Sequence, residues 1–227
     1  MTLDRRPTTR ESRRAWARTR PGGVDLVVLA AAVVAVGLIT ADVMAGGWLT
    51  HVDETVRNAT IPAGGAPTWT RGISVMGNIA VGGGVVLVAA IVTMQISWRW
   101  WPGVVAVATF ASTGVTVLVL KAVVGRSGPK FERLPDGYLG YFPAGHTAIA
   151  AVSIGTVVFL VATWHGGRLV RARRLGVIVG AVAGVTVATS SVLGGFHWFT
   201  DVVASLVIAT AAMWVGFSMA VRYADHG

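Results

Sequence analysis

The chain has 227 residues, of which 54% are hydrophobic and only 13% are charged, and its mean hydropathy is +0.67. This composition excludes an ordinary soluble or disordered protein and is typical of a membrane protein. The absence of cysteine excludes disulfides, thiolate zinc sites and cysteine nucleophiles, and leaves histidine and carboxylate chemistry open. The formal net charge is +9, so the distribution of positive charge along the chain indicates its orientation in a bilayer.

The chain begins with an Arg-rich segment, residues 1–23, that has seven arginines and no apolar run, so we expect a basic, solvated tail. A membrane-spanning helix needs about 20 apolar residues. Six stretches meet this requirement, at residues 24–45, 73–96, 103–120, 147–164, 175–193 and 201–221. The predicted fold class is all-α, a six-helix transmembrane bundle over residues 24–221 with a short tail at 222–227.

Six spans place both termini on the same side of the membrane. Of the nineteen Lys and Arg residues, thirteen lie on the side of the termini and six lie on the other side. The positive-inside rule therefore predicts that both termini are cytoplasmic. The connecting segments 121–145 and 194–200 then share the external face, so residues beside them are expected to lie close together.

Five ionisable residues beside these two external segments need an explanation, because charged groups near membrane depth are costly. They are Lys121, Arg126, His146, His197 and Asp201. A turn-rich stretch follows Lys121, and its backbone amides can meet an anion. The helix that starts beside His146 offers unpaired N–H groups to a phosphate. These features together predict an anion site at the external end of the bundle.

His197 and Asp201 are four residues apart, so in a helix the carboxylate can hold one imidazole nitrogen and leave the other free. Such an imidazole can attack phosphorus if a second acid protonates the departing alkoxide and cations offset the developing charge. His146 is the candidate acid, and Lys121 and Arg126 are the candidate cations. The alternative is a metal site of His146, His197 and Asp201, which the neighbouring positive charges disfavour.

At these residues the sequence resembles the type 2 phosphatidic acid phosphatase superfamily, whose motifs read K-x6-R-P, P-S-G-H and S-R-x5-H-x3-D. The matching residues are Lys121 and Pro129, then Pro143, Gly145 and His146, then Ser190, His197 and Asp201. The resemblance implies a metal-independent lipid phosphatase with a six-helix membrane bundle and no cofactor. It also implies that His197 becomes phosphorylated, that His146 acts as the general acid and that Asp201 completes the catalytic set.

Three positions depart from the motifs, namely Gly128, Ala144 and Ser191, where the family has Arg, Ser and Arg. Each lost charged hydrogen bond weakens phosphate binding by about 1.5 to 3 kcal/mol. A rebuilt phosphate site would use Lys121, Arg126, the close backbone approach permitted by Gly145, and the Ser191 hydroxyl. The alternative is a catalytically impaired phospholipid-binding or scaffold protein of the same fold.

The sequence therefore predicts an integral lipid phosphatase that acts on a lipid phosphomonoester or an isoprenyl diphosphate. Its partners are the lipid substrate and the bilayer, with no nucleic acid, and its expected location is a bacterial inner membrane with the site facing outward. A transporter is disfavoured because no inverted repeat or broken-helix pair is present. Asp25 and Asp42 are expected near the ends of the first span. Asp53, Glu54 and Arg57 are interpreted as a solvated helical face.

Overall fold

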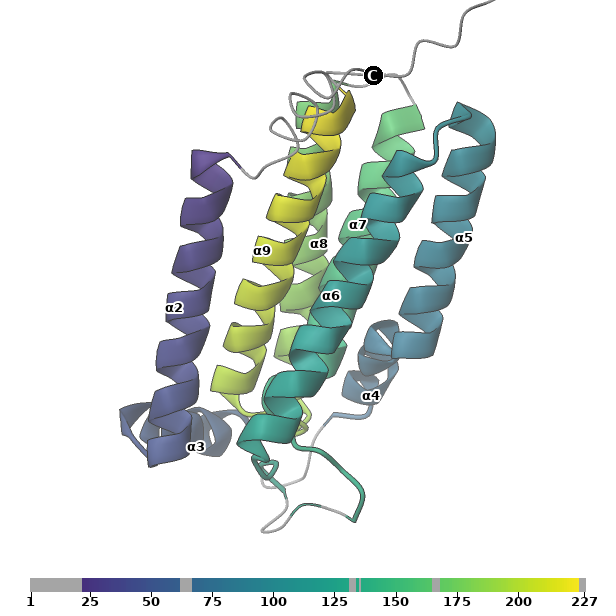
Figure 1. Cartoon of the computed structure of the whole chain (residues 1–227). Helices are drawn as coiled ribbons and strands as arrows, with labels where there is room; N and C mark the ends of the chain where they lie inside the picture. The colour runs from purple at the N-terminus through teal and green to yellow at the C-terminus, as the bar shows by residue number, and fades with distance from the viewer. Residues whose placement is uncertain (1–21, 62–66, 131–133, 135, 165–167, 225–227) are drawn as a thin grey trace, which may run out of the picture.

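The computed structural model describes residues 22–61, 67–130, 134, 136–164 and 168–224. Within these ranges every regular element is a helix (Figure 1). In chain order they are α2 (Gly23–Ala45), α3 (Trp48–Thr60), α4 (Trp69–Ser74), the 3-10 helix η1 (Val75–Gly77), α5 (Ile79–Ser97), α6 (Trp101–Val124), α7 (Gly145–Trp164), α8 (Leu169–Leu193) and α9 (Phe199–Ala224). The expected all-α fold class is confirmed. Nearly all of the predicted basic tail, residues 1–21, lies outside the described residues.

Six of these helices, α2, α5, α6, α7, α8 and α9, are long and apolar enough to cross a membrane. The six predicted spans are therefore confirmed, although their bounds shift. The second predicted span, 73–96, starts too early, because the Asn78 side chain accepts hydrogen bonds from the backbone N–H groups of Ala80 and Val81. This cap begins α5 at Ile79, and the residues before it form α4 and η1.

The core of the bundle is centred on α7, which is the most deeply buried of the six candidate spans. It approaches α8 closely, because a Cβ built on Gly180 would lie only 2.6 Å from the carbonyl oxygen of Ala151. Glycine at this position permits the two helix backbones to touch. Phe159 of α7 stacks on Phe217 of α9, with ring centroids 4.3 Å apart. By contrast, α2 and α5 leave many apolar side chains exposed, as helices that face lipid do.

Carboxylates fix both ends of α2. At its start, Asp25 forms an ion pair with Arg222 in the last turn of α9 and accepts a hydrogen bond from the Gly22 N–H at 3.1 Å. At its end, Asp42 accepts a hydrogen bond from the Leu49 N–H at 2.8 Å, which holds the start of α3 against α2. Asp25 and Asp42 therefore lie near the ends of the first span, as predicted from the sequence.

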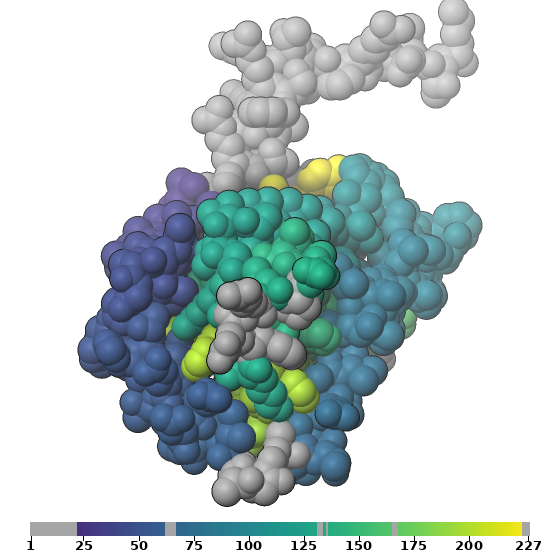
Figure 2. Space-filling view, turned by 90° about the horizontal axis from the view of Figure 1, so that it is seen from below, coloured from purple at the N-terminus to yellow at the C-terminus, as the bar shows by residue number. Residues whose placement is uncertain are grey.

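The short helix α3 lies across one end of the bundle, where α6 finishes and α9 begins (Figure 1). Figure 2 views this end, with α3 in blue beside the teal segment after α6 and the yellow-green segment before α9. The interpretation of Asp53, Glu54 and Arg57 as a solvated face is wrong for Asp53, which is 0% exposed, whereas Glu54 and Arg57 are exposed. The Asp53 carboxylate turns towards the first turn of α9, where backbone N–H groups need partners.

Candidate active site

Three segments that are distant in the sequence meet at the end of the bundle covered by α3. Lys121 lies in the last turn of α6, His146 lies in the first turn of α7, and His197 precedes the start of α9. Two backbone hydrogen bonds join these segments: Ala144 N–H donates to the Asp201 carbonyl at 3.1 Å, and Tyr141 N–H donates to the Arg126 carbonyl at 2.9 Å. The structure therefore brings the three predicted motif regions together at one end of the protein.

His197 is oriented by Asp201. The His197 Nδ1 atom lies 3.3 Å from Asp201 Oδ2, and both side chains are buried. The same carboxylate oxygen accepts a hydrogen bond from the Trp198 backbone N–H at 3.1 Å, which fixes Asp201 in the first turn of α9. An ionised carboxylate only accepts hydrogen bonds, so a neutral His197 ring in this pair would carry its proton on Nδ1 and keep the Nε2 lone pair. The geometry is the one that a nucleophilic imidazole needs.

Lys121 and His146 lie at the same end of the bundle as His197. His146 is exposed and follows Gly145, whose backbone borders the Lys121 side chain. Lys121 is 9% exposed, donates a hydrogen bond from Nζ to the Gly140 carbonyl, and lies over the Tyr138 ring at 5.2 Å from its centroid. Within the described ranges Lys121 forms no ion pair with a carboxylate. A buried ammonium in this state favours an anion beside it.

Gly145 and Ser191 have different surroundings. A Cβ built on Gly145 would lie 3.6 Å from Lys121 Cε, so this glycine borders the lysine side chain. Ser191 is 1% exposed, and its carbonyl accepts hydrogen bonds from the N–H groups of Phe196 and His197 at 2.9 and 3.4 Å. Ser191 therefore shapes the turn that carries His197.

The Arg126 guanidinium lies between two carboxylates. Its NH2 nitrogen is 2.7 Å from Asp53 Oδ2, and its NH1 nitrogen is 2.8 Å from Asp201 Oδ1. NH1 also donates to Thr200 Oγ1 at 2.8 Å, and the guanidinium lies over the Trp198 ring at 5.1 Å from its centroid. Both terminal nitrogens of Arg126 are therefore engaged by protein oxygens before a substrate arrives.

A tyrosine occupies the space beside Gly128, the position where the first family motif has arginine. A Cβ built on Gly128 would lie 2.9 Å from both Cε1 and Cζ of Tyr141. The Tyr141 ring also meets the His197 ring edge-on, with centroids 5.6 Å apart. Burial raises the pKa of the Tyr141 hydroxyl above its usual value, so the ring stays neutral at physiological pH and adds no negative charge beside His197. The missing arginine and the tyrosine are thus alternatives for the same space.

Gly128→Arg is expected to destabilise the protein while Tyr141 is present, because overpacking costs about 1 to 3 kcal/mol. Gly72→Arg is the matched control, since a Cβ on Gly72 meets no atom within 4 Å. Thermal unfolding in detergent should show a lower midpoint for Gly128→Arg than for the control. Adding Tyr141→Ala to Gly128→Arg should recover the midpoint. Equal midpoints for the two arginine variants would contradict the steric account.

Sequence reasoning missed the part of this site that comes from α3. Asp53 and Thr200 were not assigned to the site, yet both contact Arg126. A signal for Asp53 was present, because it lies among Leu49, Val52 and Val56 on the apolar side of an amphipathic helix. A carboxylate on such a face needs a buried partner. The described ranges contain no cluster of three or more His, Asp or Glu side chains placed to hold a metal ion.

The comparisons with known proteins agree with this architecture. Residues 102–224 match the sequence pattern of the PAP2 superfamily, and the chain belongs to that family. Its fold is that of a PAP2-type membrane phosphatase: the crystal structure of a transmembrane PAP2-type phosphatidylglycerolphosphate phosphatase from Bacillus subtilis is similar, with a TM-score of 0.65 and 19% sequence identity. The similarity covers 86% of this chain and 96% of that one. No curated protein matches the chain.

Proposed function

We propose that the protein hydrolyses a phosphomonoester or a diphosphate on a lipid in two steps. In the first, His197 Nε2 attacks the terminal phosphorus, and the bond from that phosphorus to the leaving oxygen breaks. The leaving oxygen is the lipid oxygen of a phosphomonoester or the bridging oxygen of a diphosphate, and His146 gives a proton to it. In the second, His146 takes a proton from a water that attacks the phosphohistidine, and the P–N bond breaks to release inorganic phosphate. Splitting the reaction in this way replaces one difficult displacement by two easier ones.

The observation that carries this proposal is the hydrogen bond that holds His197 to Asp201, at the end of the bundle where the buried Lys121 and the exposed His146 also lie. Asp201 fixes the tautomer of His197 and stabilises the positive charge that the ring gains when it attacks. Lys121 offsets the negative charge on the phosphoryl oxygens, and does so more strongly in a site with little water. The first turn of α7, which begins at Gly145, adds backbone N–H groups and a favourable helix dipole.

Arg126 and Ser191 were predicted to hold phosphate directly. In the proposed site both have supporting roles. A guanidinium has five N–H groups, and Asp53, Asp201 and Thr200 accept hydrogen bonds from three of those of Arg126. The remaining N–H groups can donate to the phosphate. Ser191 places the turn that presents His197. Lys121 therefore carries most of the proposed phosphate recognition.

The proposed substrate approaches from the external leaflet of a bacterial inner membrane. The excess of Lys and Arg on the side of the termini supports this orientation, because it places the end of the bundle with His197 outside. The exposed apolar helices would accommodate the hydrocarbon chain. Phosphatidate, phosphatidylglycerol phosphate and a polyprenyl diphosphate are the substrate classes to compare, since walls of Val, Ala and Leu discriminate weakly among chains.

The test is phosphate release by the purified protein in detergent from these three lipid classes, with and without excess EDTA. We expect release from at least one class, unchanged by the chelator, because the proposed steps use only side chains of this chain. Loss of release with EDTA would contradict the metal-independent mechanism. No release from any of the three lipids, by a protein that binds them, would support the impaired scaffold instead.

A further inference from the structure

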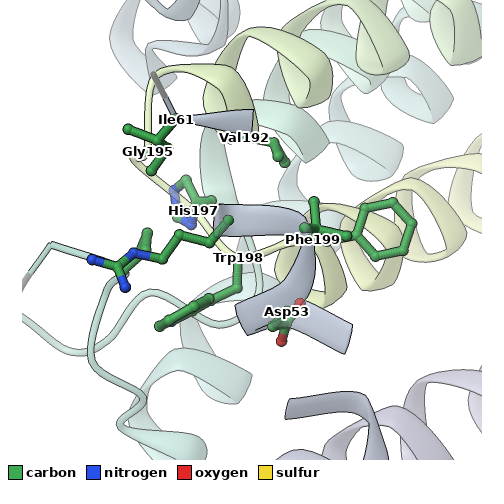
Figure 3. A pocket seen from close by; sticks show the side chains of 10 residues that line it. Asp53, Ile61, Val192, Gly195, His197, Trp198 and Phe199 are labelled. Carbon is green, nitrogen blue, oxygen red and sulfur yellow. The ribbon is translucent and has the colours of Figure 1, made fainter. Parts of the chain in front are cut away.

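The starting observation is a carboxylate that no motif includes. Asp53 belongs to α3, outside residues 102–224, and is 0% exposed although its helix neighbour Glu54 is exposed. Burying a charged carboxylate is costly unless it is fully paired. Asp53 lines the same pocket as His197 and Trp198 (Figure 3). A buried carboxylate this close to the proposed nucleophile can influence the orientation of His197.

The Asp53 carboxylate is fully paired. Oδ1 accepts a hydrogen bond from the Thr200 backbone N–H at 2.8 Å, and Oδ2 accepts one from Thr200 Oγ1 at 2.6 Å. Oδ2 also meets the NH2 nitrogen of Arg126 at 2.7 Å. Thr200 is the second residue of α9, so Asp53 satisfies an N–H group that the helix itself leaves unpaired and places a negative charge at the positive end of the helix dipole.

These contacts form a continuous chain to the proposed nucleophile. Arg126 contacts Asp53 through NH2 and Asp201 Oδ1 through NH1, at 2.7 and 2.8 Å. The other oxygen of Asp201 holds His197 Nδ1 at 3.3 Å. Asp201 is thus shared between a guanidinium and an imidazole, and Asp53 is the second carboxylate on that guanidinium.

We propose that Asp53 is a positioning residue for the phosphoryl-transfer reaction, which acts on His197 through Arg126, Asp201 and the first turn of α9. The kinetic part of this inference rests on the proposed function. The attraction between Asp53 and Arg126 weakens the attraction between Arg126 and Asp201. The Asp201 carboxylate can then bind the Nδ1 proton of His197 more strongly. Asp53 also fixes the turn on which Asp201 is placed, so it sets both the orientation and the basicity of the attacking ring.

Removing the charge of Asp53 has a definite expected consequence. In Asp53→Asn, Arg126 keeps only Asp201 as a charged partner and pulls that carboxylate from His197. The ring then loses orientation, while Lys121, which holds the phosphate, is untouched. The expected result is a fall of about 10- to 100-fold in kcat, with a much smaller change in KM because Lys121 carries most of the proposed phosphate recognition. Glu54→Gln, which removes a charge from the exposed neighbour on the same helix, is the matched control and should keep the parent kcat.

A double-mutant cycle tests whether the effect passes through Arg126. In Asp53→Asn combined with Arg126→Gln, the loss in activation free energy should be smaller than the sum of the two single losses, because the route through Arg126 is already gone. Additive losses, or a normal kcat per folded molecule in Asp53→Asn, would overturn the proposal. Thermal unfolding measures the folded fraction of each variant. If Asp53→Asn does not fold, Thr200→Val is the second variant, because it removes only the hydroxyl that contacts both Asp53 and Arg126. Thr200→Val should also lower kcat. An unchanged kcat in Thr200→Val would overturn the proposal.

A spectroscopic measurement separates this inference from the proposed function. In protein labelled with 15N-histidine, the ring-nitrogen shifts of His197, assigned by comparison with His197→Gln, report which nitrogen carries the proton. They should change in Asp53→Asn and stay unchanged in Glu54→Gln. A parent that releases no phosphate but shows this change would contradict the proposed function and support the positioning role. An active parent whose His197 shifts ignore Asp53 would overturn the positioning role alone.

Discussion

His197→Gln is expected to abolish phosphate release from every lipid that the parent hydrolyses. Glutamine keeps a polar group near Asp201 but offers no nitrogen lone pair that can attack phosphorus. Loss of the nucleophile of a catalytic triad lowers kcat by about 10⁶-fold, which would put this variant below detection. The measurement is phosphate release, together with trapping of 32P on the protein after a quench in alkaline detergent, in which the P–N bond of phosphohistidine is stable. Both signals should vanish in the variant.

The control for this substitution is His51→Gln, because His51 is an exposed histidine on α3 that the site does not use. This variant should keep the parent rate and the trapped 32P. Retention of activity in His197→Gln would rule out the phosphohistidine mechanism. A stable 32P adduct in that variant would point to another nucleophile in the same site.

His146→Gln is expected to lose about 10²- to 10⁴-fold in kcat on lipid substrates, the usual contribution of a general acid. The loss should depend on the leaving group. A lipid alkoxide needs a proton as it departs, whereas the p-nitrophenolate of p-nitrophenyl phosphate leaves without one. The measured quantity is the rate of phosphohistidine formation in the variant, as a fraction of the parent rate. This fraction should be much larger with p-nitrophenyl phosphate than with a lipid substrate.

The comparison between the two histidines makes this prediction specific. His197→Gln should fail on both substrates, because every substrate needs the nucleophile. Burst kinetics with p-nitrophenyl phosphate should show that His146→Gln forms the phosphohistidine but hydrolyses it slowly, since the water then lacks its base. Equal losses on both substrates in the formation step would show that His146 does not protonate the leaving group.

The six spans could be predicted because length and apolar composition are local properties of the sequence. The start of the second span was missed because a single side chain, Asn78, begins α5 by pairing with the next turn, and hydropathy does not register such a cap. His146 and His197 could be predicted to lie at the same end of the bundle, because the order of the spans puts their two connecting segments on the same side of the membrane. Helix order alone was enough for that inference.

The part of the site that could not be predicted depends on long-range pairing. Asp53 and Thr200 are 147 positions apart, and no periodicity in either segment specifies their contact. The environment of Gly128 was equally hidden, because the tyrosine that fills its space comes from the far side of the same connecting segment. Family motifs describe which side chains hold phosphate, but they do not say which neighbour takes the space of an absent one.

The pairing of α2 and α3 with α9 has a mechanical consequence. Asp25 pairs with Arg222 near the C-terminal end of α9, at one surface of the bundle. At the opposite surface, Asp53 of α3 accepts a hydrogen bond from Thr200 at the N-terminal end of α9. Asp42 in turn holds the start of α3 against α2. Parting α2 and α3 from α9 would break the Asp25–Arg222 ion pair at one end of α9 and the hydrogen bonds from Thr200 to Asp53 at the other, roughly a bilayer apart. These contacts hold α2, α3 and α9 together at both ends, so we expect a lipid that reaches the proposed site from the bilayer to enter between other helices.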